Sequence, residues 1–310
     1  MARRLRVEYP GAIYHLMNRG DRREPIFQDD QDRELFLQTF TEVCTKTGWQ
    51  VHAHVLMPDH FHLVVETPGA NLVSGMKWFL GTYTSRFNRR HKLFGHLFSG
   101  RYKSLSVDGS GNGYLKTVCD YVHLNPSRAK LINADQALKT FPWSSWPEYL
   151  KAPSKRPKWL RADRLLGEHG VPKDSPAGRK ELERRMEAAR GAEDTNEYKP
   201  IRRGWCLGEK SFRSELLERM SERAGQNHGG DEMRETEEQQ AKAIVARELG
   251  RRRWDEGELS RRPKGDAAKA WIARRLRQET TVTYEWIARR LKMGSVSTVK
   301  RSLRELDLIK

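Results

Sequence analysis

The sequence predicts an α+β fold, with an antiparallel sheet in the first half of the chain and a mostly α-helical second half. Short apolar runs of strand character occur early, and stretches with helical spacing separate them. Beyond residue 150 the pattern changes to charged helical segments with glycine-containing breaks. The sheet is therefore expected to lie within the first half of the chain.

Local signals define the elements of the first half. Acidic residues at the start and Gly48 at the end favour a helix from Asp29. Met57, Pro58 and Asp59 are typical of a tight turn that joins two strands in a hairpin. The predicted strands span residues 12–18, 49–56, 60–66 and 102–107, and the predicted helices span 29–48, 71–90 and 114–125.

The order strand, helix, strand, strand, helix, strand is that of the ferredoxin-like arrangement, in which helices pack on one face of an antiparallel sheet. We therefore expect the other face of the sheet to be available for a functional site. The helix that begins at Tyr114 is an additional element. Its regular part should end before Pro126, because proline disfavours helical geometry in the residue before it.

The charge of the chain points to a polyanionic partner such as nucleic acid. Among 310 residues, 58 Lys and Arg face 41 Asp and Glu, which gives a net charge of +17 and a pI near 9.9. The sequence has no run of 18 or more apolar residues, and its first residues lack the apolar core of a signal peptide. We therefore expect a soluble cytoplasmic protein. The cysteines Cys44, Cys119 and Cys206 are too few and too scattered for a disulfide framework or a thiolate zinc site.

Two histidines at the start of the strand predicted over residues 60–66 form a possible metal-binding pair. Alternate residues of a strand point the same way, so His60 and His62 project from one face if Phe61 faces the core. Two half-buried histidines satisfied by hydrogen bonds are the more common meaning of this pattern. His52 and His54 form a second such pair, which we interpret as sheet residues that could support the site.

The predicted third helix carries a candidate nucleophile. A phenol such as that of Tyr121 has a pKa of about 10, which a nearby cation can lower, and its attack on phosphorus gives a covalent phosphotyrosine. Asn125 lies four residues further on, so an amide oxygen would project from the same side of a helix. Two imidazoles and one amide oxygen leave open coordination positions, which suits Mg²⁺ or Mn²⁺ better than a closed structural zinc.

Three motifs together resemble a known family. PDHFH at 58–62, GRYK at 100–103 and DYVHLNP at 120–126 are similar to the single-tyrosine HUH transposases, specifically the REP-associated tyrosine transposases. The resemblance implies that residues 1–150 are a catalytic nuclease domain that binds single-stranded DNA hairpins of repetitive extragenic palindromes. It also implies that Tyr121 forms a 5′-phosphotyrosine and releases a 3′-hydroxyl, with a divalent metal bound by His60 and His62.

The same resemblance leaves two questions open. Related transposases of small insertion sequences carry glutamine four residues beyond the tyrosine, where this chain has the shorter Asn125. His123 is another possible third ligand, although two residues from Tyr121 on a helix it should point elsewhere. Those related transposases act as dimers that exchange the tyrosine helix, whereas the REP-associated proteins act as monomers, so either state is compatible with the sequence.

Basic residues elsewhere in the first unit are candidate DNA contacts. Arg101 and Lys103 flank Tyr102 on a short strand, a pattern that can hold a phosphate and stack a base, although a solvated edge strand has the same appearance. Asn18, Arg19 and Arg22 follow the first strand and could also contact DNA, although a charged turn is the default interpretation.

The C-terminal part is expected to contain two further regions, a helical and partly flexible connection at 151–240 and a basic unit at 241–310. The latter holds 19 basic and 9 acidic residues, a net charge of +10. Helices at 284–291 and about 297–306 around a glycine-containing turn resemble a helix-turn-helix, although an ordinary basic helical pair is the alternative. The candidate contacts to bases and phosphates are Ser295, Ser297, Thr298, Lys300 and Arg301.

Two functions follow from these patterns. The first is a nuclease and strand transferase in which Tyr121 cleaves and rejoins single-stranded DNA. The second is a catalytically silent, sequence-specific DNA-binding regulator that uses the C-terminal helix-turn-helix. The joint presence of His60, His62 and Tyr121 favours the first.

Overall fold

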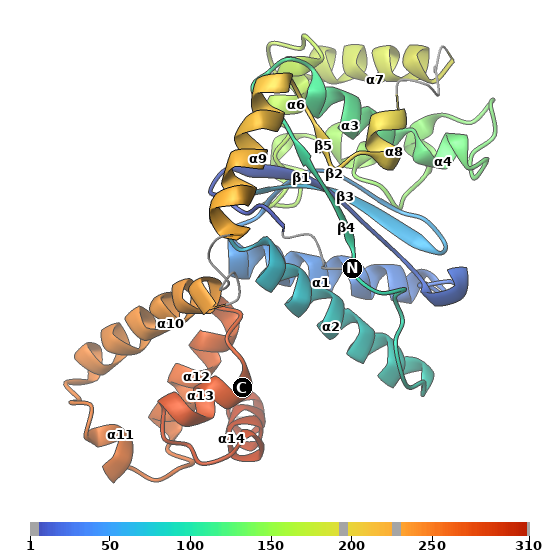
Figure 1. Cartoon of the computed structure of the whole chain (residues 1–310). Coiled ribbons are helices and arrows are strands. Elements are labelled where there is room, and N and C mark those ends of the chain that lie inside the picture. The colour runs from blue at the N-terminus through green and yellow to red at the C-terminus, as the bar shows by residue number, and fades with distance from the viewer. Residues whose placement is uncertain (1–5, 192–197, 225–230, 309–310) are drawn as a thin grey trace.

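The computed structural model describes residues 6–191, 198–224 and 231–308. Its centre is a five-stranded sheet with the strand order β2-β3-β1-β4-β5 (Figure 1). The first four strands pair antiparallel, and β5 adds to β4 in parallel, so the sheet is mixed. The strands are β1 (Ala12–Arg19), β2 (Gln50–Leu56), β3 (His60–Thr67), β4 (Lys103–Val107) and β5 (Cys206–Leu207).

The predicted order of strands and helices in the first half is confirmed, and the fold is α+β. The expectation that the sheet lies entirely within the first half is wrong, because β5 comes from a segment beyond residue 200. Its two residues pair with β4, with Ser106 opposite Cys206 and Val107 opposite Leu207. A strand this short has no detectable periodicity in sequence.

Two long helices cover one face of the sheet (Figure 1). In α1 (Asp30–Thr47), the Asp29 carboxylate accepts the Asp32 N–H at 3.0 Å, and Gly48 ends the helix with a φ of 73°. Helix α2 (Leu72–His91) lies beside α1. Their apolar sides and the sheet enclose an aromatic core that includes Phe36, Phe40, Phe61, Phe79 and Tyr83.

The opposite face of the sheet is also covered, contrary to the expectation that it would be open. Helix α3 (Tyr114–His123) packs across it and buries Leu115, Val118 and Val122 against Val64 and Leu105. These strand residues are apolar, so leaving this face in water would cost hydrophobic free energy. The other elements on this side are α4 (Asn125–Arg128), α5 (Trp146–Tyr149), α6 (Asp163–Glu168), α7 (Pro176–Gly191), α8 (Lys199–Arg203) and the short 3₁₀ helices Leu138–Thr140 and Pro153–Lys155.

The last third of the described chain is helical and has a core of its own. Helix α9 (Lys210–Ala224) runs beside the sheet, and the lobe beyond it holds α10 (Asp231–Arg252), α11 (Glu258–Arg261), α12 (Ala267–Glu279), α13 (Tyr284–Arg290) and α14 (Val296–Leu308) (Figure 1). Residues of α10, α12, α13 and α14 share one apolar cluster. This lobe meets the sheet unit where Lys46 of α1 donates to the carbonyl of Arg277. In the parts of the chain that the structure describes, no helix is long and apolar enough to span a membrane.

Candidate active site

His60 and His62 both lie on the sheet face that carries α3. In the register of β1 and β3, His60 stands opposite Arg19 and His62 opposite Met17, while Phe61 points into the aromatic core between the sheet and α2. Alternation along the strand thus separates the two imidazoles from Phe61, as the sequence predicted.

Each of the two imidazoles is oriented by a hydrogen bond at Nδ1. Nδ1 of His60 donates to the Asp59 carboxylate, which can only accept when ionised. Nδ1 of His62 and Nε2 of His15 share a hydrogen bond of 2.8 Å. These contacts leave Nε2 of both His60 and His62 for another ligand, which is the arrangement of metal-binding histidines supported by a second group.

The spacing of the rings fits a shared divalent ion. The ring centroids of His60 and His62 are 5.1 Å apart, with the rings nearly perpendicular. Two imidazoles that bind one ion through nitrogens at roughly 2.1 Å place their centroids roughly 5 Å apart. Among the described residues, however, no group of three His, Cys, Asp or Glu side chains could hold a metal ion. Any further ligand would have to be an amide oxygen, a substrate oxygen or water.

Burial keeps the imidazoles of the site neutral near pH 7. Desolvation lowers the pKa of His15 to about 4 and that of His62 well below its ordinary value. Burial also lowers the pKa of His60, and the Asp59 carboxylate opposes that shift. Neutral imidazole is the form that binds a metal ion, so the site needs no deprotonation at physiological pH.

Tyr121 of α3 lies against these histidines within a single chain. Its ring centroid is 5.6 Å from that of His62 and 5.8 Å from that of His15, in both cases edge to face. On its other side the guanidinium of Arg128 lies 4.2 Å from the ring, and Tyr198 follows with a centroid distance of 5.2 Å. The phenol is therefore held between two imidazoles and an arginine.

Helix α3 ends at His123, which confirms that the regular helix stops before Pro126. Asn125 begins the short helix α4 and is 8% exposed. Among the described residues no backbone hydrogen bond joins Asn125 to Tyr121, and the Tyr121 carbonyl accepts from the Arg128 side chain. Asn125 thus follows Tyr121 across a break in the helix rather than on one regular turn.

His52, His54 and His123 contact groups other than Tyr121. His123 is buried, with Nε2 2.8 Å from the Ser145 hydroxyl and its ring against Trp146. A bulge between Val51 and Ala53 breaks the alternation of β2, so that His52 contacts Glu66 and His54 contacts Trp159. Both contacts lie apart from His60 and His62, and His52 and His54 do not act as a pair.

His54 predicts a measurable dependence of stability on pH. Desolvation lowers its pKa from 6.5 to about 4, so between those values the unfolded chain binds a proton that the folded chain does not. The free energy of unfolding should therefore fall as the pH drops from 6.5 to 5, by about 1 kcal/mol per pH unit on average for this group. Urea unfolding of the parent and of His54→Gln checks this: the variant should have a shallower slope, and equal slopes would contradict the prediction.

The candidate DNA contacts of the first unit fall in different places. Arg19 lies beside the histidines and pairs with Asp59 at 3.3 Å, and Lys103 is exposed on the same face opposite Met17. Arg22 and Arg101 are exposed outside the sheet. Asn18 stands opposite Phe61 on the other face and is buried, so the structure does not bring it to the histidines.

Tyr102 is also unsuited to stack a base as the sequence pattern suggested. Its side chain is buried among the aromatic residues on the α2 side of the sheet. The guanidinium of Arg6 lies 3.7 Å from the centre of its ring and covers it. Arg101 and Lys103 therefore flank a core residue, and a phosphate bound by their exposed charges would not be accompanied by a base stacked on Tyr102.

The C-terminal candidates lie on a second surface, formed by α13 and α14. The turn between these helices contains Gly294 with a φ of 85°, and Met293 and Val299 are buried beneath it. The five predicted contact residues lie at the start of α14 and none is buried: Ser295, Ser297, Thr298, Lys300 and Arg301.

Sequence reasoning missed four side chains of the site: His15, Asp59, Arg128 and Tyr198. His15 had a detectable signal, since it alternates with Met17 on a predicted strand. Asp59 directly precedes His60 and was assigned only to the turn. Arg128 and Tyr198 come from segments whose position depends on tertiary packing, so the sequence gives no signal for them.

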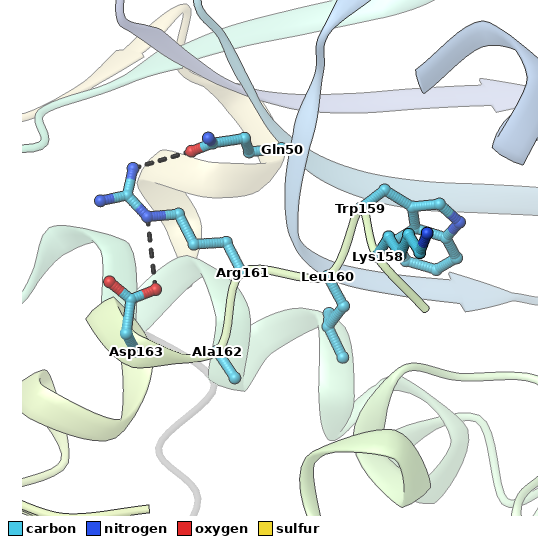
Figure 2. Close-up of a pocket in the computed structure, with 7 residues that line it drawn as sticks. All are labelled: Gln50, Lys158, Trp159, Leu160, Arg161, Ala162 and Asp163. Carbon is cyan, nitrogen blue, oxygen red and sulfur yellow. Dashed lines mark hydrogen bonds and ion pairs between the residues drawn. The ribbon is translucent and has the colours of Figure 1, made fainter. Parts of the chain in front are cut away.

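A shallow depression lies beside the start of β2 (Figure 2). It has a volume of about 380 Å³ and is lined by Gln50 and residues 158–163. Arg161 within it donates to Gln50 at 2.9 Å and to Asp163 at 3.3 Å. Gln50 pairs with Glu66, at the end of β3 opposite to His60. The depression thus lies at the other end of β3 from His60, and its Arg161 side chain is paired with Glu66 and Asp163.

Comparisons with known proteins found two similarities. One solved structure, titled "Structure of the REP associates tyrosine transposase bound to a REP hairpin", is similar at 14% identity and a TM-score of 0.41, covering 51% of this chain and 91% of that one. No curated protein matches the chain. A family model described as "Transposase IS200 like" matches residues 8–125, the stretch that holds β1 to α3 and the start of α4. Residues 8–125 of this chain are therefore similar to the IS200-like transposase family.

Proposed function

We propose that the sheet-containing unit is a metal-dependent single-stranded DNA endonuclease and strand transferase that acts on palindromic hairpins. The observation that carries this proposal is the position of Tyr121, whose ring lies 5.6 Å from His62 on the sheet face shared with His60. A buried phenol against His62, one of two neighbouring neutral imidazoles with an available Nε2, is the arrangement that a tyrosine nucleophile of phosphoryl transfer needs.

In the proposed reaction, the phenol oxygen of Tyr121 attacks a backbone phosphorus. A new bond forms between that oxygen and phosphorus, and the bond from phosphorus to the 3′ oxygen breaks. The phenol proton is lost to solvent, the released 3′ oxygen takes up a proton, and the 5′ phosphate stays on Tyr121. Attack by another 3′-hydroxyl on the phosphotyrosine reverses these steps and rejoins DNA.

The surrounding side chains have distinct roles in this proposal. His60 and His62 would hold Mg²⁺ or Mn²⁺, with Asn125 as the candidate third ligand. Such an ion supplies polarisation of the phosphate and neutralises charge that develops on its oxygens. Asp59 and His15 fix the orientation of the two imidazoles. Arg128 packs on the face of the Tyr121 ring and limits its rotation.

A direct experiment tests the proposal. The full chain is incubated with hairpin oligonucleotides that carry single-stranded flanks, in Mg²⁺ or Mn²⁺, and resolved on a denaturing gel. A covalent complex of protein and DNA supports the nuclease. Tight binding without any covalent complex, across a set of hairpins, would overturn it in favour of a catalytically silent regulator.

We further propose that the chain is organised as a sheet unit, a connecting region and a C-terminal unit that binds duplex DNA. The apolar cluster beneath α3 includes Leu160, Leu182, Ile201 and Leu207, so the sheet unit extends beyond residue 150. In the C-terminal unit the exposed start of α14 presents hydroxyl and basic side chains on a glycine-containing turn, as a recognition helix requires.

The α14 surface predicts a change in the salt dependence of duplex binding. Replacing both Lys300 and Arg301 by alanine should reduce the slope of log affinity against log salt by about 0.9 for each lost phosphate contact. Fluorescence anisotropy over a range of salt concentrations measures this slope. Arg184→Ala on α7, where the side chain is 69% exposed and pairs with Glu181, is the matched control. A slope unchanged by the double substitution would remove α14 from DNA binding.

A further inference from the structure

Phe94 has the most exposed large apolar side chain of the described residues, with 99% of its surface open to solvent. It lies in the connection between α2 and β4, next to Leu93, which is 46% exposed. A single exposed apolar side chain is common in proteins. The backbone around Phe94 and the charges near it are what distinguish this one.

Asn88 holds the chain on both sides of Phe94. Its carbonyl accepts the N–H of Leu93 at 2.9 Å, and its side-chain amide donates to the carbonyl of Gly95 at 3.0 Å. Lys92 and Gly95 turn the backbone with φ values of 54° and 94°. The ring is therefore presented to solvent by a constrained turn, which lowers the entropic cost of binding through it.

Exposed cations lie along the chain on both sides of this turn and in the 3₁₀ turn that is hydrogen-bonded to Leu97. Acidic partners neutralise Arg90, which pairs with Asp29 and Asp32. In contrast, six exposed basic residues have no ion-pair partner among the residues that the structure describes: Arg22, Arg23, Arg89, Lys92, Arg101 and Lys103. Their positive potential attracts a polyanion to the surface around Phe94.

Backbone hydrogen bonds connect the Phe94 turn to the histidine site. Asp21, at the start of the 3₁₀ turn Asp21–Arg23, donates its N–H to the Leu97 carbonyl at 3.0 Å. Gly20 donates its N–H to the Asp59 carbonyl at 2.8 Å. Three residues of chain from Phe94 to Leu97, two strand spacings, and the steps from Asp21 to Gly20 and from Asp59 to His60 place the two Cα atoms of Phe94 and His60 at most roughly 28 Å apart. About eight stacked nucleotides of a single strand cover this distance.

We propose that Phe94 stacks on an unpaired nucleobase of single-stranded DNA whose phosphates are bound by the surrounding cations. An aromatic ring accepts the face of any base, and neighbouring basic side chains hold the backbone. A base inside a duplex stem has no free face, so the contact selects the single-stranded part of the substrate. This inference rests on the proposed function for the identity of the polyanion.

Photo-crosslinking tests the contact directly. The full chain carrying Tyr121→Phe, which under the proposed function should leave DNA uncleaved, is bound to hairpins with 5-iodouracil placed at successive unpaired positions and irradiated. Mass spectrometry should find one position linked to Phe94. In the same background, Phe94→Ala should abolish that crosslink and weaken binding of the flanked hairpin about 5- to 100-fold. Phe94→Trp should keep both, and Leu93→Ala is the matched control whose affinity should change by less than about twofold.

Two outcomes of these measurements would overturn the inference: crosslinks only at other residues, or equal affinity of Phe94→Ala and its parent. A third would be a dimeric mass of the parent in sedimentation that Phe94→Ala reduces to that of a monomer, because Phe94 would then be a contact between two copies of the chain. The test is separable from that of the nuclease. If the parent chain forms the covalent complex but Tyr121→Phe shows no crosslink at Phe94, only this inference is refuted. If the crosslink at Phe94 is found but the parent chain forms no covalent complex, only the proposed nuclease activity is refuted.

Discussion

Replacing Tyr121 by phenylalanine should abolish covalent capture of a hairpin oligonucleotide while leaving its affinity nearly unchanged. The substitution removes one oxygen from a ring that His62, His15 and Arg128 hold by its faces and edges, so packing is preserved. Without the nucleophile no phosphotyrosine can form. The yield of complex should fall by a factor on the order of 10⁴ or more, as losses of single catalytic groups do.

Tyr198 supplies a matched control for this experiment. Its ring lies 5.2 Å from that of Tyr121 and shares the contact with Arg128, so Tyr198→Phe removes the same atom from the same cluster. We expect Tyr198→Phe to retain covalent capture. If capture instead persists in Tyr121→Phe and disappears in Tyr198→Phe, the nucleophile is Tyr198 and the assignment of Tyr121 is wrong.

Replacing His60 by alanine should remove both metal binding and covalent capture. His60 and His62 present the only two ring nitrogens assigned to the ion, so losing one should weaken Mn²⁺ binding by more than about 100-fold. Calorimetric titration of Mn²⁺ into the DNA-free protein measures this affinity. The fold should tolerate the change, since His60 is part-exposed at the start of β3.

Comparison with Tyr121→Phe separates the two roles. That variant should bind Mn²⁺ as the parent does and yet fail to capture DNA, whereas His60→Ala should fail in both assays. Equal Mn²⁺ affinity of His60→Ala and the parent would exclude His60 as a ligand. The pair would then be what the bare sequence pattern most often means, namely two histidines held by hydrogen bonds.

Strong local signals explain which parts of the fold were predictable. The Asp29 cap and Gly48 define α1, and Pro126 stops α3 where expected. The alternation of β3 correctly set His60 and His62 apart from Phe61. Each of these depends on residues close in sequence, where propensity and period act directly.

Long-range packing explains what the sequence did not reveal. Nothing in the sequence indicates that β5 joins the sheet or that Tyr198 packs beside Tyr121, because both depend on contacts across a large sequence separation. Regular alternation along β2 would place His52 and His54 on the same face of the sheet. The bulge in β2 breaks this alternation, since one inserted residue changes the face of every residue after it, so the two histidines do not form the expected pair. The sequence also did not reveal that the second face of the sheet is covered, because that packing too depends on residues far apart in the sequence.

The site itself was only half visible in the sequence. His60, His62 and Tyr121 were identified from residue type and spacing, and the structure brings His62 and Tyr121 into ring contact. The residues that orient them, His15 and Asp59, emerged only from the register of β1 with β3 and from the hairpin turn. A supporting residue has no characteristic type, so spacing alone does not reveal it.

The most direct test of the proposed function is the identity of the residue that carries DNA in the covalent complex. The complex formed by the parent chain with a hairpin oligonucleotide and Mn²⁺ is digested with a protease and a nuclease, and the nucleotide-bearing peptide is sequenced by mass spectrometry. We predict a 5′-phosphate linked to Tyr121. A 5′-phosphate on Tyr198 or on any other residue would contradict Tyr121 as the nucleophile of this site.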